Sequence, residues 1–204
     1  MQKNDAEWKQ LERLALAYYQ QRTKEDSHPS IKIKQGIARL WNKGAKKRLG
    51  YFYKGRITIF DSGKPTNLNT LLHELGHSAR MIFPYFKESI KQYDKDFSYE
   101  LHSSKGIDEA IAISFNEEAL QFIKETIGDE DGYAAIINKA QDEFNERNLR
   151  PLPQCNKPMN LGRKIYQKLR EQHSSPFSYL YNTKEEVLLR ELSKLKSKPN
   201  SKLR

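Results

Sequence analysis

The chain has 204 residues, of which 37% are hydrophobic and 30% charged, and its formal net charge is +10. This length suits one domain with a sizeable core, and this composition excludes an intrinsically disordered chain. No apolar run approaches the roughly 20 residues of a membrane-spanning helix, and the N-terminus lacks the apolar core of a secretory signal. We therefore expect a cytoplasmic protein with no membrane segment; delivery outside the cell by a signal-less route stays open.

The first 60 residues predict one helix followed by short strands. From about residue 6, apolar residues recur at every third or fourth position, which is typical of a helix packed on a core. Alternation over 31–33 predicts a strand that 38–41 continue, and the segment 50–60 (GYFYKGRITIF) predicts a hairpin with its turn at the Lys-Gly pair. The apolar positions of the helix are Trp8, Leu11, Ala15 and Tyr18.

Five segments with helical periodicity follow the strands. Pro84 marks the end of the first of them, and Gly128 marks the end of the second, for which Ser104 is the expected cap. The order of helix, strands and then helices indicates an α+β fold. The approximate bounds of the five helices are 66–83, 107–127, 133–148, 161–172 and 185–195.

Two histidines and a glutamate lie in the stretch 70–79, TLLHELGHSA. His73 and His77 are one helical turn apart, so both rings project from the same side of the helix, away from its leucine stripe. Two imidazoles so placed can bind one zinc ion at about 2.0–2.1 Å. Glu74 is then positioned as the general base for a metal-activated water. Gly76 costs stability inside a helix, which indicates that another element packs closely against it.

A catalytic zinc needs a third protein ligand, which must come from downstream. Glu109 is the preferred residue because it opens a helix that is otherwise apolar, with Ile113 on the same face packing behind it. Glu117 and Glu118 are expected on a solvated face, and Asp108 is explained by the preference of acids for a helix N-terminus. The residues considered as third ligand are Asp94, Asp96, His102, Asp108, Glu109, Glu117, Glu118 and His173.

The HELGH stretch, followed by Glu109 at the head of EAIAIS, resembles the gluzincins, zinc peptidases whose third ligand is a glutamate on a second helix. The resemblance covers roughly residues 30–125. It extends to three compact groups: immunity-repressor-cleaving metallopeptidases, the metallopeptidase domain of mobile-element antirestriction proteins, and the catalytic domain of anthrax lethal factor. It implies a zincin-like domain with a small sheet, an HExxH active-site helix, a second ligand-bearing helix and additional C-terminal helices.

The sequence departs from this pattern at the residues that support the ligands. Thermolysin-like enzymes place an aspartate after the third ligand to orient a histidine, whereas Ala112 and Ile113 stand there in this chain. The group that orients the histidine must therefore come from elsewhere. Zincins of this type often stabilise the oxyanion with a tyrosine or histidine, and Tyr99 and His102 are the residues that fit this role.

Charge is unevenly distributed along the chain. Residues 150–204 hold 13 Lys and Arg against 4 Asp and Glu, and residues 31–60 hold nine basic residues and no acidic one. The last two predicted helices have apolar stripes that leave a basic face outward. A solvated surface explains this excess most simply; an acidic partner or nucleic acid would also be attracted to it.

Together these features predict a zincin-like catalytic domain over 1–149 and a basic helical extension over 150–204 packed on the same domain. The expected function is a Zn²⁺-dependent endopeptidase that acts on a protein or peptide substrate. The alternative is a mobile-element or DNA-associated accessory protein that binds nucleic acid through its basic regions, with the zinc site auxiliary or inactive. A third reading keeps zinc only as a structural element.

Overall fold

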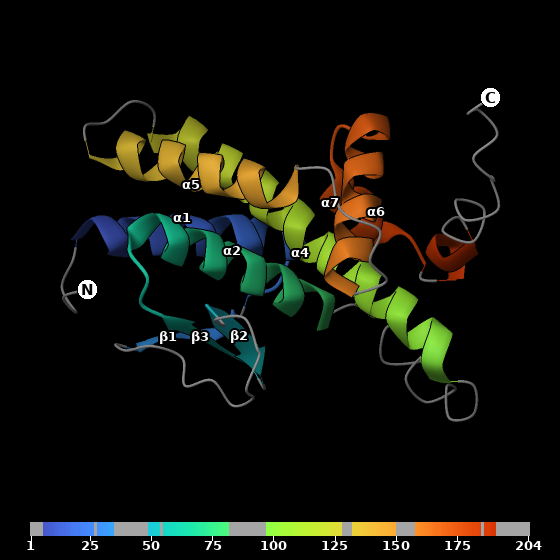
Figure 1. Ribbon diagram of the computed structural model, residues 1–204. Helices are drawn as coiled ribbons and strands as arrows, with labels where there is room; N and C mark the ends of the chain where they lie inside the picture. Colours follow the sequence, from blue (N-terminus) through green and yellow to red (C-terminus); the bar gives the residue numbers. More distant parts are fainter. Residues whose placement is uncertain are drawn as a thin grey trace.

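The computed structural model describes residues 6–26, 28–34, 49–53, 55–81, 97–127, 132–149, 158–184 and 186–190. Side chains are described throughout these ranges except at 80–81, 97–104 and 158–159. The described part is α+β and mostly helical, as predicted (Figure 1). None of its helices combines the length and apolar character needed to cross a membrane. The elements are α1 (Ala6–Thr23), β1 (Ser30–Lys34), β2 (Gly50–Tyr53), β3 (Arg56–Phe60), α2 (Lys64–Met81), α4 (Phe97–Ile127), α5 (Tyr133–Asn148), α6 (Pro158–Gln172) and α7 (Pro176–Asn182).

The sheet has three strands in the order β1-β3-β2. β1 runs parallel to the central strand β3, and β2 forms the predicted antiparallel hairpin with it. Ile57 and Ile59 of β3 are fully buried, and α2 packs on β2 and β3. Figure 1 shows the sheet below α1 and α2, with α5 on the opposite side of these helices. The predicted continuation of the first strand at 38–41 lies outside the described residues.

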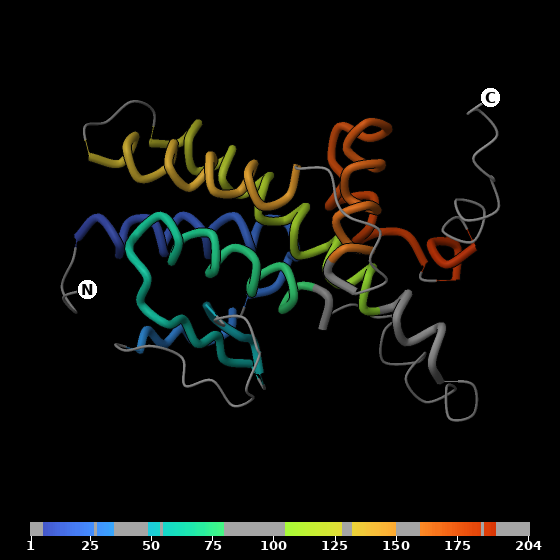
Figure 2. The backbone as a smooth tube through the Cα atoms, in the orientation of Figure 1, coloured from blue at the N-terminus to red at the C-terminus, as the bar shows by residue number. Residues whose placement is uncertain are grey.

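Helix α4 is the central element of the helical part. It packs against α1, α2, α5, α6 and α7, and its middle is lined by apolar residues that are almost fully buried. In Figure 2 the backbone of α4 crosses the molecule diagonally and passes beside α6. The buried apolar residues of α4 are Ile107, Ala110, Ile111, Ala112, Ile113, Phe115, Ala119, Leu120, Ile123 and Ile127.

Two helix predictions need correction. The second ligand-bearing helix was expected to begin at about Ile107, but α4 begins ten residues earlier, at Phe97. Ser104 was expected to cap this helix, but it lies inside α4. Gly106 also lies inside α4, at a point where α6 approaches closely: a Cβ on Gly106 would lie 2.6 Å from Leu161. Helix α7 was not predicted at all. It has seven residues, too few to display a helical period, and begins at Pro176 after the capping residue Ser175.

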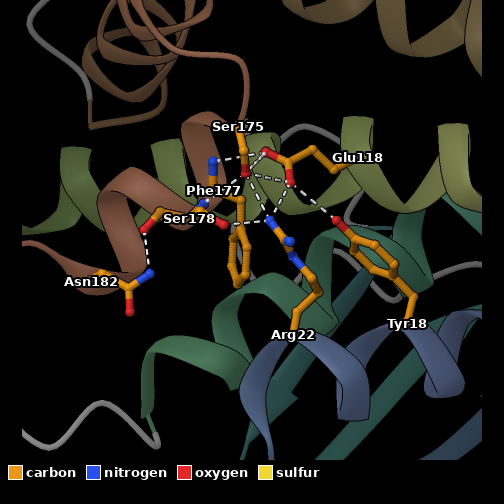
Figure 3. Close-up of polar contacts among 7 residues, drawn as sticks. All are labelled: Tyr18, Arg22, Glu118, Ser175, Phe177, Ser178 and Asn182. Atoms are coloured by element: carbon orange, nitrogen blue, oxygen red, sulfur yellow. Dashed lines mark hydrogen bonds and ion pairs between the residues drawn. The ribbon is translucent and has the colours of Figure 1, made fainter.

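Glu118 of α4 does not lie on a solvated face, contrary to the sequence-based expectation. Its carboxylate accepts hydrogen bonds from Tyr18 and Arg22 of α1 at 3.1 and 2.9 Å. It also accepts bonds from the Ser175 hydroxyl and from the backbone N–H of Phe177, at the start of α7, each at about 2.9 Å (Figure 3). The side chain of Glu118 is only 16% exposed. This carboxylate therefore joins three helices that are far apart in the sequence.

Candidate metal centre

The two histidines of α2 converge as their spacing predicts. Their rings meet edge to face with centroids 4.7 Å apart, and the Nε2 atom of His73 lies 3.2 Å from the Nε2 atom of His77. Two nitrogens bound to one tetrahedral zinc at about 2.0–2.1 Å lie roughly 3.3 Å apart. The histidine pair therefore has the separation that a shared metal ion requires.

Gly76 brings α4 close enough to complete the cluster. A Cβ at this position would lie 2.5 Å from the Ala112 Cα and 3.1 Å from the Phe115 Cβ, so only glycine allows this approach of α2 and α4. The close contact predicted from a glycine in mid-helix is thus confirmed. Since Ala112 lies three residues after Glu109 on α4, the same approach carries the Glu109 side chain to the histidines.

Glu109 lies beside both rings. Its Oε2 atom is 3.5 Å from His73 Nε2, and its Oε1 atom is 4.0 Å from His77 Nε2. One ligand atom from each of the three side chains lies within 4.8 Å of the others. Oε2 is buried and has no hydrogen-bond partner among the described residues. Two imidazoles and a carboxylate oxygen with an unmet bonding capacity form a donor set that fits a Zn²⁺ ion.

Asp108 supplies the orienting carboxylate that the sequence left unassigned. Its Oδ2 atom lies 3.1 Å from the Nδ1 atom of His77, on the side of the ring opposite the ligand cluster. The contact is a close ion-pair approach, although the N–H is not aligned for a geometric hydrogen bond. A carboxylate at Nδ1 favours the tautomer that leaves Nε2 free to bind a metal. Asp108 is therefore placed to orient the His77 ring. The helix-dipole role expected for it does not apply, because α4 begins at Phe97.

The electrostatics of the cluster favour a cation. Burial alone would lower the pKa of His77, but Asp108, Glu109 and Glu74 outweigh it and raise that pKa to about 9. For Glu109, burial raises the pKa, but the two histidines reverse this and hold it below the ordinary value. Three carboxylates thus surround the two imidazoles and make this region electronegative.

Replacing Asp108 with asparagine should lower zinc affinity by about 10- to 100-fold, because the ring of His77 loses the charged group that fixes its orientation. Competition with a chromophoric chelator measures this change. Glu171→Gln, which neutralises an exposed acid on α6, serves as the matched control and should leave the affinity unchanged. Equal zinc affinities for the Asp108→Asn and wild-type proteins would contradict the positioning role.

Glu74 lies beside the ligands and close to strand β2 of the sheet. It is buried, with 9% of its surface exposed, and its charge acts on His77. A Cβ on Gly50, the first residue of β2, would lie 3.7 Å from the Glu74 Cγ and only 2.4 Å from Thr70. Glycine at this position therefore lets the edge strand β2 run directly past the expected general base.

The remaining sequence-predicted residues are placed as follows. Tyr99 and His102 belong to α4, but their side chains lie outside the described residues, as do Asp94 and Asp96 altogether. His173 stacks on Tyr179 with ring centroids 3.9 Å apart and does not join the cluster. Glu117 pairs with Arg170 at 2.7 Å, at a distance from the ligand group. Within the described residues, only the predicted trio of His73, His77 and Glu109 forms a metal-ligand group.

Comparison with known proteins finds no match: no family model, no curated protein and no solved structure is similar to this chain.

Proposed function

We propose that this chain is a zinc-dependent endopeptidase of gluzincin type, built on a zincin-like domain. The observation that carries the proposal is the convergence of His73, His77 and Glu109 from two helices, with Glu74 buried next to the first histidine. A structural zinc site is closed by four protein ligands, whereas a catalytic one keeps a position open. Three ligands with a carboxylate beside them match the catalytic type.

Each residue has a separate task in peptide hydrolysis. His73, His77 and Glu109 would hold Zn²⁺, which when bound acts as a Lewis acid toward the peptide carbonyl and lowers the pKa of water. Glu74 accepts the proton of the attacking water and later delivers it to the leaving amine. Asp108 keeps the His77 ring in the ligating tautomer. Tyr99 and His102 remain the proposed residues for stabilising the developing oxyanion.

The edge of β2 supplies a place for an extended substrate. The N–H of Phe60 donates to the Leu49 carbonyl, so alternate residues from Leu49 onward bond to β3. Gly50 and Phe52 consequently direct their N–H and C=O groups away from β3, and no strand of the described part pairs with that edge. A substrate added there as a further strand would pass beside Glu74.

Glu74→Gln separates metal binding from chemistry and tests the proposal. The amide keeps the shape of the side chain but cannot take up a proton, so we expect wild-type zinc content and at least a 1,000-fold loss of cleavage, on the order expected for a missing general base. Mapping new N-termini in a cell lysate treated with wild-type or Glu74→Gln protein measures this difference. Glu125→Gln, an exposed change on α4, is the control.

Two outcomes would contradict the enzymatic assignment. Cleavage at wild-type rates by Glu74→Gln would remove this glutamate from the mechanism. Bound zinc with no new N-termini from either protein would favour the reading in which zinc is only a structural element. Retention on a nucleic-acid column that weakens steeply with salt would support the other alternative, an accessory protein that binds nucleic acid through its basic regions.

A further inference from the structure

Helix α6 brings a cationic side chain to the metal centre. A Cβ on Gly162 would lie 2.4 Å from the Glu109 Cβ and 3.0 Å from the Gly106 carbonyl oxygen, so the backbone of α6 touches the third ligand. Arg163 is the next residue on this helix. It lies close enough to Glu109 for that carboxylate to act on its charge.

The guanidinium of Arg163 has unused hydrogen-bonding capacity. The side chain is half-buried, and its Nε atom is shielded from solvent with no hydrogen-bond partner among the described residues. The N–H groups of arginine cannot be deprotonated in proteins, so a shielded one retains its charge and its need for an acceptor. Such a group fits an anion that arrives from outside the described part of the chain.

The neighbours of Arg163 do not satisfy its charge. Burial and the like charge of Arg147, at the end of α5, lower the pKa of Arg163, and Glu109 opposes them. Glu109 lies beyond ion-pair distance and faces the two histidines instead. Arg147 is exposed and close enough to add a second positive charge to the same region. Two arginines therefore lie close together, and within the described residues neither forms an ion pair with a carboxylate.

We propose that Arg163, assisted by Arg147, binds a carboxylate of the peptide substrate beside the metal centre. This inference rests on the proposed peptidase function and names a feature of its substrate. The carboxylate belongs either to an acidic side chain near the scissile bond or to the C-terminus of a short peptide. Arginine suits both, because its planar fork donates two parallel hydrogen bonds to one carboxylate.

Binding without turnover tests the subsite directly. The probes are four fluorescein-labelled octapeptides of glycine and alanine, with a central glutamate or glutamine and a free or amidated C-terminus. Fluorescence anisotropy with zinc-loaded Glu74→Gln protein should show tighter binding of the carboxylate-bearing peptides. Introducing Arg163→Gln into the Glu74→Gln protein should weaken the binding of these peptides by about 10- to 100-fold, as for the loss of a charged hydrogen bond. The affinity for the neutral peptide should not change. Arg163→Lys should restore part of the loss.

Two further substitutions are compared with Arg163→Gln. Lys164→Gln removes an exposed charge one residue away on α6 and should change no affinity. Arg147→Gln, on an exposed residue, should give a smaller loss in the same direction, and it carries the test if Arg163→Gln fails to fold. A loss confined to the glutamate peptides assigns the subsite to an acidic side chain, and a loss confined to the free-acid peptides assigns it to the C-terminus.

Other outcomes overturn the inference. Equal affinity for all four peptides would overturn it. So would a loss of peptide affinity in Lys164→Gln as large as the loss in Arg163→Gln. Cleavage of lysate proteins together with peptide binding that ignores Arg163 would refute the subsite and leave the peptidase function standing. Carboxylate-selective binding that depends on Arg163, with no cleavage by the wild-type protein, would support the subsite and refute the peptidase function.

Discussion

Alanine at His73 or His77 should abolish tight zinc binding, while the wild-type protein carries about one zinc per chain. Each imidazole supplies one of three ligands, and their Nε2 atoms lie 3.2 Å apart, so neither can replace the other. Glu109→Ala should weaken binding in the same direction. Metal analysis by mass spectrometry after desalting measures the zinc content of each variant.

His173→Ala is the matched control for this experiment, because it removes an imidazole that stacks on Tyr179 away from the cluster. It should keep the full zinc content. Stoichiometric zinc in both the His73→Ala and His77→Ala proteins would refute the metal centre. Loss of zinc from His173→Ala would place the metal at a different site.

Removing the Glu118 carboxylate should destabilise the fold. Glu118→Ala should lower the free energy of unfolding by about 3 kcal/mol, because it removes the carboxylate partner of Arg22 and the acceptor of the Ser175 hydroxyl and the Phe177 N–H. This contrasts with the near-neutral effect of a solvated glutamate. Chemical denaturation followed by circular dichroism gives the difference in unfolding free energy.

Glu125→Ala removes an exposed glutamate from the same helix and should cost no more than about 0.5 kcal/mol. The double variant Arg22→Ala/Glu118→Ala should be less destabilised than the sum of the single variants, because the two residues share one interaction. Strict additivity would show that Arg22 and Glu118 are not coupled. A Glu118→Ala protein as stable as wild type would show that the network in Figure 3 contributes nothing to stability.

Local patterns were enough to predict the elements that bring the ligands together. The leucine stripe and the histidine spacing of α2 depend only on residues within one helix, and both agree with the structure. Gly76 could be interpreted because a glycine in mid-helix needs a reason, and the contact with Ala112 provides it. Glu109 was chosen because it was expected to open an otherwise apolar helix. The apolar residues are buried as expected, although α4 begins earlier, at Phe97.

Contacts between distant residues were beyond the reach of the sequence. Glu118 looked like any acid on a helix because its partners, Arg22 and Ser175, lie 96 and 57 residues away. Asp108 could not be assigned to His77, since the direction of its side chain depends on how α4 crosses α2. The same reasoning took Ser104 for the start of a helix, although that helix begins at Phe97.

The basic outward face expected of the C-terminal helices is less uniform than its composition indicated. Lys164 is exposed, but Arg170 pairs with Glu117 at 2.7 Å and Arg163 has a shielded Nε atom beside the metal cluster. Net charge counts these residues equally, although only some of them are available to a partner in solution.

The contact between Gly162 and Glu109 forms late in the synthesis of these helices. A ribosome releases α2 and α4 before α6, so both histidines and the glutamate leave the exit tunnel while the helix that backs the glutamate is still unmade. Until about residue 162 has emerged, no residue of α6 packs against the Glu109 Cβ, and the Glu109 side chain can adopt other rotamers. The three proposed ligands are therefore expected to bind a metal ion tightly only after α6 has been made and has packed on α4.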